Sequence, residues 1–336
     1  MSEDLKAIEK KIFEVSPADF NAVALEIFAY QYRENNLYRS FCEHLHIQLD
    51  DVKQVIQIPF LPIRFFKTNR IVSGIFEEAG VFESSGTTGS INSKHYVKDL
   101  ALYERSFSQG IQHFYSDISN TCIIGLLPSY LEKGQSSLVY MVNNLIVKSK
   151  IASSGFYLYE AAELKQLLLQ NERAGIKTLL FGVTYALLDF AEQHPMQLRH
   201  TTVIETGGMK GKRTEMTRAQ VHGILKTQWQ LPAVHSEYGM TELLSQAYSF
   251  GEGLFRTSPT MKALIRAEDD PLEVKWTEQV QQKAITGAVN IIDLANLHSC
   301  SFIATDDMGI LHADGSFEIV GRLDNSDIRG CSLMLL

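Results

Sequence analysis

Residues 177–205 read KTLLFGVTYALLDFAEQHPMQLRHTTVIE, and this stretch decides the fold class. Residues 177–183 and 201–205 are short apolar runs rich in β-forming side chains, whereas residues 185–193 repeat their apolar side chains at helical spacing. A strand, a helix and a second strand in so short a stretch are typical of a βαβ unit. We therefore predict an α/β fold with helices on the faces of a largely parallel sheet.

The same alternation continues toward the N-terminus. Residues 121–127 form another apolar β-type run, and residues 161–171 carry leucines on one helical face, which we interpret as core packing. Apolar residues at helical spacing predict helical structure over residues 19–45. The prolines of residues 58–63 predict an ordered extended segment, with a linker as the alternative.

The pattern changes after about Leu254. Strand-like runs separated by turns follow at residues 288–294, 301–305 and 317–320. We predict an N-terminal helical segment over residues 1–60, an α/β body over residues 61–254 and a smaller β-rich part over residues 255–336.

Composition and charge narrow the class of protein. The chain has 336 residues, 45% of them hydrophobic and 21% charged, which is ordinary for a soluble globular protein with a large core. Its net charge of -8 is spread along the chain without a Lys/Arg-rich run, so we expect no nucleic-acid partner.

The cysteines and the N-terminus indicate the compartment. Cys42, Cys122, Cys300 and Cys331 lie far apart and match neither a zinc site nor a disulfide framework. The N-terminus lacks the basic flank and apolar core of a signal peptide, and no apolar run is long enough to span a bilayer. We expect a cytoplasmic protein with reduced thiols and no membrane span.

The segment Ser84-Ser85-Gly86-Thr87-Thr88-Gly89-Ser90 is the first motif that carries chemistry. Hydroxyls and backbone N–H groups that converge in a glycine-containing loop bind anions, and the nearby Lys94 adds positive charge for a polyphosphate. We interpret the segment as a phosphate-binding loop. A solvated surface loop is the alternative.

Other nucleotide-binding signatures fail. Residues 207–214 contain Gly-Lys, but Arg213 stands where a Walker loop needs Ser or Thr. Neither Gly-x-Gly-x-x-Gly nor Gly-x-Ser-x-Gly occurs in the chain. A standard P-loop ATPase, a dinucleotide-dependent dehydrogenase and an α/β-hydrolase are therefore excluded.

Four motifs occur in the order and approximate spacing of the adenylate-forming (ANL) superfamily. They are Ser-Ser-Gly-Thr-Thr-Gly at 84–89, Tyr-Gly-Met-Thr-Glu at 238–242, Thr-Asp-Asp-Met-Gly at 305–309 and Gly-Arg-Leu-Asp at 321–324. Within that superfamily the chain resembles the LuxE-type acyl-protein synthetases of bacterial bioluminescence. The further similarities are its short length, Ile-Pro-Phe-Leu-Pro at 58–62, Phe66-Lys67 and Ile-Arg-Gly-Cys at 328–331.

This resemblance, which spans nearly the whole chain, implies an ANL-type adenylation domain that uses ATP and Mg²⁺. Thr241 matches the residue that binds the α-phosphate, Glu242 the carboxylate that holds Mg²⁺, and Lys94 a lysine that assists at the phosphates. The other nucleotide-binding positions are Ser84, Ser85, Gly86, Thr87, Thr88 and Gly89 at the β- and γ-phosphates, Gly207, Gly208 and Tyr238 around the adenine, Asp307 and Arg322 near the ribose, and Gly239 in the Tyr-Gly-Met-Thr-Glu motif.

Some of these residue types also allow a simpler role. Tyr238 is alternatively a core tyrosine, and Asp306-Asp307 is alternatively a charged turn. His235 is a candidate catalytic base or acyl-pocket residue, with a hydrogen-bonded histidine at a strand end as the alternative.

The C-terminal end differs from most members of the superfamily. Relatives continue past the Gly-Arg-x-Asp motif into a lid domain whose lysine contacts the substrate carboxylate, whereas only residues 325–336 follow Asp324 here. The resemblance therefore implies that the lid is absent. Cys331, with Arg329 nearby to favour its thiolate, is the candidate acyl carrier, and a small packing residue is the alternative.

The leading hypothesis is an ATP-dependent acyl-protein synthetase. It activates a carboxylic acid, which the family implies to be fatty, to acyl-AMP, transfers the acyl group to Cys331, and passes it to a reductase or acyltransferase partner. A phenylacetate-CoA-ligase-like enzyme that uses CoA or a carrier protein is the first alternative. A nucleotide-binding scaffold without catalysis is the second.

Overall fold

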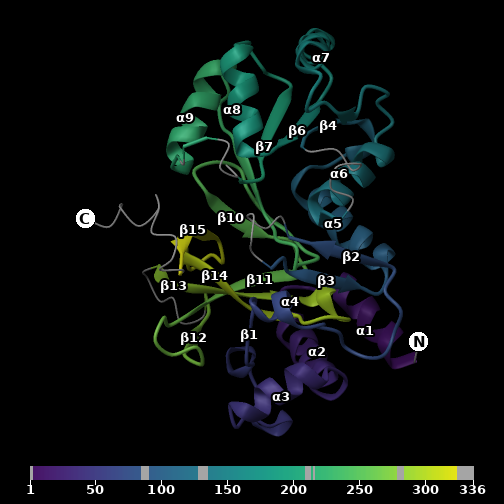
Figure 1. Cartoon of the computed structure of the whole chain (residues 1–336), viewed down its shortest axis with the longest axis vertical. Coiled ribbons are helices and arrows are strands. Elements are labelled where there is room, and N and C mark those ends of the chain that lie inside the picture. Colours follow the sequence, from purple (N-terminus) through teal and green to yellow (C-terminus); the bar gives the residue numbers. More distant parts are fainter. Residues whose placement is uncertain are drawn as a thin grey trace. The chain divides into compact units, whose positions relative to one another are not determined.

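Residues 3–84, 91–127, 135–208, 213–214, 216–277 and 284–323 are described by the structure, a computed structural model of the chain (Figure 1). They divide into two units. The first unit contains the chain up to Gly110, then Gly239–Ala247, and then the stretch from Arg256 onward. The second unit contains Ile111–Tyr238 and Tyr248–Phe255.

The second unit confirms the predicted parallel sheet. Its strands pair in parallel in the order β5 (Gly155–Phe156), β4 (Cys122–Leu126), β6 (Thr178–Gly182), β7 (Thr201–Glu205) and β8 (His235–Tyr238). Every residue of β4 and of β6 is buried. Continuous apolar runs of this kind are expected for parallel strands that are covered on both faces.

Helices follow the strands of this sheet. They are α6 (Ser137–Lys148), α7 (Ala161–Ala174), α8 (Thr184–Gln193) and α9 (Arg218–Trp229). The α8 helix begins directly after β6 and packs closely on it, because a Cβ at Gly182 would lie 2.6 Å from the Leu187 side chain. The α9 helix is capped by Thr217, which forms a capping box with Gln220.

The first unit contains an antiparallel sheet. Its order is β12 (Val274–Lys275), β11 (Met261–Arg266), β13 (Ile285–Asp293), β14 (Phe302–Leu311) and β15 (Phe317–Arg322). The short strand β1 (Leu61–Pro62), which lies in the predicted extended segment, pairs in parallel with β14. The strands β2 (Gly80–Glu83) and β3 (Lys94–Val97) form a separate hairpin.

N-terminal helices pack against this antiparallel sheet. They are α1 (Glu3–Phe13), α2 (Phe20–Glu34) and α3 (Asn36–His44), and α4 (Phe65–Thr68) follows β1. The ring of Tyr38 stacks on Phe302 of β14 with centroids 6.1 Å apart, and Phe28 contacts the same ring. Aromatic packing of this kind joins the N-terminal helices α2 and α3 to the strand β14, which lies far along the chain.

The predicted helical stretch over residues 19–45 is two helices. Asn35 separates them, and its side-chain oxygen accepts a hydrogen bond from the backbone N–H of Tyr38 at 3.0 Å. Its amide also donates to the carbonyl of Ser299 at 3.1 Å. The helix break is therefore an N-cap that also contacts the far end of the chain.

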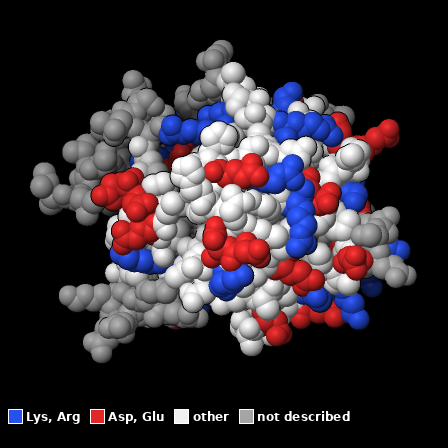
Figure 2. All heavy atoms as spheres, turned by 90° about the horizontal axis from the view of Figure 1, so that it is seen from below, with Lys and Arg blue, Asp and Glu red and all other residues white. Residues whose placement is uncertain are grey.

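Three elements adjoin the boundaries between the units. The helix α5 (Leu100–Phe114) and the strands β9 (Ala247–Ser249) and β10 (Leu254–Thr257) each have residues in both. In the face shown in Figure 2, acidic and basic side chains intermingle with uncharged ones, without a broad region of one sign. In the part of the chain that the structure describes, no helix has the length and apolar character of a membrane span.

Candidate active site

The residues predicted to act on a nucleotide or an acid lie in both units. Ser84, Lys94, Gly239, Thr241, Glu242, Asp307 and Arg322 belong to the first unit, and Gly207, Gly208, His235 and Tyr238 belong to the second. The chain passes from the second unit to the first at the Tyr238–Gly239 bond, inside the Tyr-Gly-Met-Thr-Glu motif. Ser85, Gly86, Thr87, Thr88, Gly89 and Cys331 lie outside the described residues.

The β2–β3 hairpin holds the two ends of the Ser/Thr/Gly segment together. The Ser84 N–H donates to the Ser93 carbonyl at 3.0 Å, and the Ser93 N–H donates to the Ser84 hydroxyl at 2.9 Å. One step further down the hairpin, the Lys94 ammonium lies 3.2 Å from the Glu83 carboxylate. The predicted phosphate-binding lysine is therefore ion-paired across the hairpin.

Glu242 lies beside this hairpin and is buried, with 5% of its surface exposed. Burial raises the pKa of its carboxyl, while a hydrogen bond with the Ser93 side chain and the positive charges of Lys67 and Arg322 act to lower it. The carboxylate predicted to bind Mg²⁺ thus meets the base of the predicted phosphate-binding segment. It does so among hydroxyl and cationic groups.

The turn that carries Thr241 and Glu242 is held by side chains rather than by a sheet. The Asn296 amide donates to the Glu242 carbonyl at 2.7 Å, and His95 Nδ1 lies 2.8 Å from the Thr241 carbonyl oxygen. The Asp293 carboxylate accepts from the N–H groups of the next residues, Leu244 at 2.7 Å and Ser245 at 2.9 Å. We call His95, Asp293 and Asn296 the clasp.

All three clasp side chains are buried, with exposures of 0–1%. Buried backbone N–H and C=O groups must find partners, and an irregular turn cannot supply them from its own backbone. The clasp therefore fixes the backbone from which the Thr241 hydroxyl and the Glu242 carboxylate project.

The hydrogen bonds and the burial of the His95 ring favour opposite protonation states. Nδ1 faces a carbonyl oxygen, and Nε2 lies 2.9 Å from the side-chain oxygen of Asn296, whose amide is already donating to Glu242. Only a protonated ring donates to both acceptors. Burial opposes that charge and, against both hydrogen bonds, lowers the pKa of His95 to about 4.

Asp307 lies in the strand β14, so Asp306-Asp307 is not an isolated charged turn. Asp307 pairs across the sheet with Arg322 of β15, whose Nε lies 3.6 Å from the Asp307 carboxylate. Asp306 forms an ion pair with Arg64 at 3.1 Å. Arg266 donates to the Thr305 carbonyl at 2.7 Å and so helps to hold this part of β14 in place.

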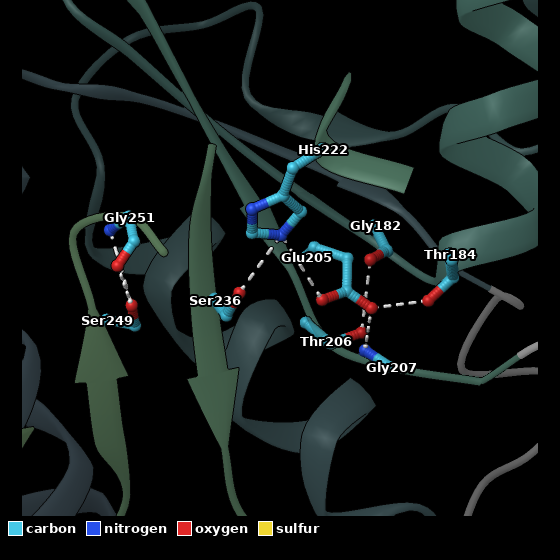
Figure 3. Close-up of polar contacts among 9 residues, drawn as sticks. All are labelled: Gly182, Thr184, Glu205, Thr206, Gly207, His222, Ser236, Ser249 and Gly251. Carbon is cyan, nitrogen blue, oxygen red and sulfur yellow. Dashed lines mark hydrogen bonds and ion pairs between the residues drawn. The ribbon is translucent and has the colours of Figure 1, made fainter. Parts of the chain in front are cut away.

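Gly207 and Gly208 follow the end of β7 in the second unit, and Figure 3 shows Gly207 there. Both have positive φ, 77° and 94°, which a glycine adopts without strain. The buried Glu205 carboxylate accepts hydrogen bonds from the Gly207 N–H at 2.8 Å and from the Thr184 hydroxyl. This carboxylate therefore fixes the backbone at Gly207, which the family resemblance predicts to lie against the adenine.

The pKa of the Glu205 carboxyl is lowered although the side chain is buried. Burial acts to raise its pKa, but His222, with Nε2 4.0 Å from its carboxylate, and the Thr184 hydroxyl outweigh that effect and lower the pKa. The Ser236 hydroxyl lies 3.4 Å from the same nitrogen of His222. The network in Figure 3 thus joins the ends of β7 and β8 to α8 and α9.

His235 is the first residue of the strand β8, and Tyr238 is the last. His235 Nδ1 lies 3.0 Å from the Tyr115 hydroxyl, and burial lowers the pKa of His235 to about 4. These contacts match the alternative of a hydrogen-bonded histidine at a strand end. The Tyr238 ring is half-buried, with its centroid 5.8 Å from that of Phe255.

Residues that sequence reasoning missed hold these predicted groups in place. His95 directly follows Lys94, and Asp293 and Asn296 are polar residues at the end of the apolar run 288–294. Polar side chains at the end of a buried strand are a signal that was available, because such positions often carry function. Which backbone they bind depends on tertiary structure. No cluster of three or more His, Cys, Asp or Glu side chains within the described ranges is arranged to hold a metal ion.

The sequence profile of the acyl-protein synthetase family LuxE matches residues 13–336. The chain belongs to this LuxE family. A curated relative, the long-chain-fatty-acid–luciferin-component ligase of Aliivibrio fischeri, is 21% identical over 333 residues. The match covers 92% of this chain and 86% of the relative. The LuxE-type family that the sequence motifs predicted is therefore confirmed over nearly the whole of this chain.

Solved structures share the fold. ATP-bound MatB from Rhodopseudomonas palustris matches with a TM-score of 0.54 and 16% identity, over 74% of this chain and 49% of MatB. The chain thus spans about half the length of that protein. A 2-hydroxyisobutyryl-CoA ligase, solved with 2-HIB-AMP and CoA, matches with a TM-score of 0.63 and 13% identity, over 94% of this chain and 71% of the ligase. These similarities confirm the predicted ANL-type fold of this LuxE family member.

Proposed function

We propose that this protein activates a carboxylic acid with ATP to form an acyl-adenylate and pyrophosphate. The arrangement around Glu242 carries the proposal: a buried carboxylate is hydrogen-bonded by Ser93 at the base of the Ser/Thr/Gly segment, with Lys67 and Arg322 in its electrostatic reach. Oxygen ligands of this kind suit Mg²⁺, which prefers one or two carboxylates together with phosphate oxygens. Membership of the LuxE family supports the same reaction class.

In this proposal the first unit binds the phosphate and ribose part of ATP. Glu242 would hold Mg²⁺, and the ion would neutralise negative charge on the phosphate oxygens. The Thr241 hydroxyl bonds the α-phosphate, and Asp307, with Arg322 beside it, bonds the ribose hydroxyls. Ser84 and the residues 85–89 that follow it bind the β- and γ-phosphates. Gly207, Gly208 and Tyr238 remain the sequence-based proposal for the adenine.

The chemical step is attack of a substrate carboxylate oxygen on the α-phosphorus. The new oxygen–phosphorus bond forms the acyl-adenylate, and the bond to the bridging oxygen breaks with its electron pair on the departing pyrophosphate. The clasp serves this step by position, because small displacements of Thr241 and Glu242 would misalign the reacting groups.

For the second half-reaction we propose transfer of the acyl group to the thiol of Cys331. The thiolate attacks the acyl carbonyl carbon, a thioester forms and AMP leaves with the electron pair of the broken bond. The thiol must be reduced for this, which fits the proposed cytoplasmic location. A fatty acid is the proposed substrate class, as the name of the Aliivibrio fischeri relative indicates, and a reductase or acyltransferase is the proposed recipient.

The direct test is exchange of labelled pyrophosphate into ATP in the presence of fatty, aryl and amino acids. We expect exchange that depends on a fatty acid and on Mg²⁺, and that is lost in Glu242→Ala. Absence of exchange with every acid, alongside intact ATP binding, would indicate the non-catalytic scaffold instead.

A second experiment identifies the acceptor. Intact mass spectrometry after incubation with ATP and acid should show a covalent acyl adduct that Cys331→Ser abolishes, while exchange persists. If the variant keeps the adduct, the Cys331 proposal is wrong and another residue is the acceptor. If the wild-type protein forms no adduct and yields product only with CoA or a carrier protein, the CoA-ligase alternative holds.

A further inference from the structure

The strand β14 bulges where it carries Asp307. On the side of β13 the pairing register shifts at this point, so that Val289 alone lies opposite residues 305–307. On the side of β15 the register shifts between Met308 and Gly309. A β-bulge bends its strand and changes the direction of its side chains, and bulges are common beside active sites. The two shifts therefore set the direction in which the Asp307 side chain leaves the strand.

Arg266 of β11 supplies hydrogen-bond donors to both sides of this bulge. Backbone groups at a bulge lose their regular partners in the sheet, and buried ones must find others. The guanidinium reaches past β13, where Nη1 donates to the Val289 carbonyl at 3.0 Å and to the Asn290 side-chain oxygen at 2.6 Å. Its Nη2 donates to the Thr305 carbonyl at 2.7 Å. Arg266 therefore joins the β13 side of the bulge to the β14 side.

The Thr305 hydroxyl makes a second bridge across the bulge. It donates to the Val289 carbonyl at 2.8 Å and accepts from the Asp307 N–H at 3.2 Å. The backbone of Asp307 is thus held by a residue whose own carbonyl accepts from Arg266. The contacts from Arg266 to Asp307 therefore pass through Thr305 alone.

The burial of Arg266 shows that these hydrogen bonds are not incidental. Only 9% of its surface is exposed, and in the part of the chain that the structure describes its acceptors are uncharged oxygens. The carboxylates of the bulge, Asp306 and Asp307, pair instead with Arg64 and Arg322. A buried charge without an ion pair is costly, and an apolar side chain would fill the same space at less cost. An apolar side chain could not hold the carbonyls of the bulge.

We propose that Arg266 is a positioning residue for recognition of the nucleotide ribose. It holds the bulge from which the Asp307 carboxylate projects, and that carboxylate is the proposed partner of the ribose hydroxyls. The inference rests on the proposed adenylation reaction and adds to it a residue that acts through Asp307 rather than by contact with the nucleotide. A carboxylate accepts from two neighbouring hydroxyls only in a narrow range of orientations, so a shift of the bulge removes the acceptor from the ribose.

Two pairs of variants test this role. Arg266→Gln removes the charge and the two-nitrogen fork of donors. Its matched control is Arg256→Gln, because Arg256 lies in the same unit, is 52% exposed and pairs with the exposed Asp314. Thr305→Val removes the hydroxyl bridge while keeping the shape of the side chain, and Thr305→Ser keeps the hydroxyl. The Thr305 pair tests the same contacts if Arg266→Gln does not fold.

Isothermal titration measures the affinity of each variant for Mg·ATP, for the 2′-deoxy analogue of Mg·ATP and for Mg·pyrophosphate. The wild type should bind ATP about 10- to 100-fold more tightly than the 2′-deoxy analogue, which leaves the carboxylate without one of its hydroxyl donors. In Arg266→Gln and Thr305→Val this preference should fall to about 3-fold or less, with pyrophosphate affinity equal to that of Arg256→Gln. Thr305→Ser should keep the preference. A loss of stability alone lowers all three affinities together and leaves their ratio unchanged.

Three results would overturn the proposal while leaving the adenylation reaction intact. One is an unchanged preference for ATP over its 2′-deoxy analogue in Arg266→Gln or, where that variant does not fold, in Thr305→Val. Another is an equal loss of affinity for all three ligands, which indicates a general disturbance. The third is a wild-type protein that supports pyrophosphate exchange but binds ATP and the analogue equally, because Asp307 then does not read the ribose. If the wild-type protein neither binds Mg·ATP nor supports exchange, both proposals are wrong.

Discussion

Acid should unfold this protein in part through one histidine, His95. Its pKa lies at about 4 in the folded protein against an ordinary value of 6.5, because the ring is buried. Between pH 4 and pH 6.5 the histidine binds a proton in the unfolded chain but not in the folded protein. The free energy of unfolding therefore falls as pH decreases from 6.5 to 4. The difference corresponds to about 3 kcal/mol at about 1.4 kcal/mol per pH unit.

The assay is urea unfolding followed by tryptophan fluorescence, repeated from pH 7 to pH 4. His95→Gln removes the titrating group but keeps a side chain able to donate to the Thr241 carbonyl, and His200→Gln, at an exposed position, is the control. We expect His95→Gln to be less stable at pH 7 yet to lose about 3 kcal/mol less than the wild type on acidification. Equal pH dependence in the wild type and His95→Gln would refute the reasoning.

Further predictions concern groups that hold predicted site residues in place within each unit. Asp293→Ala should cost about 3 to 5 kcal/mol of unfolding free energy in urea titrations, since buried N–H groups lose a charged acceptor. Glu205→Ala should destabilise far more than Glu205→Gln, which keeps an oxygen for the Gly207 N–H; equal effects would contradict this. Gly207→Ala should cost only about 1 kcal/mol, measured the same way, because its φ of 77° is strained for alanine but the space beside it is open. Mg²⁺ affinity of the ATP complex should weaken as pH falls, because burial raises the pKa of Glu242, and Glu242→Gln should remove that dependence in calorimetry.

Much of the fold was predictable because local patterns of apolar residues indicate its strands and helices. The run over residues 177–205 became β6, α8 and β7, since continuous apolar strands and an amphipathic helix leave few other arrangements. The C-terminal strands were predicted in place but too short. Residues 301–305 are only the start of β14, which continues through Asp306 and Asp307 to Leu311, because pairing with β13 and β15 overrides the turn preference of those aspartates.

The motif residues of the candidate site were predictable from the sequence, but the residues that hold them in place were not. Glu242 and Ser84 were named from the sequence, and the structure brings Glu242 to Ser93 at the base of the segment that Ser84 begins. Nothing local to Asn296 indicates that its amide binds the Glu242 carbonyl, 54 residues away along the chain. The pairing of Lys94 with Glu83 likewise depends on hairpin register, which the motif spacing alone does not specify.

The order in which the chain is synthesised has a consequence for how this protein reaches its native state. The first unit joins residues from both ends: Gln31 of α2 hydrogen-bonds Ser301, 270 residues later, and β1 pairs with β14. Its N-terminal helices therefore emerge from the ribosome long before the strands that cover them, with Phe28 and Tyr38 still lacking Phe302. The parallel sheet of the second unit comes from one continuous stretch and has its partners early. During synthesis the second unit should fold first, and the N-terminal helices should stay without their packing partners until β14 has emerged.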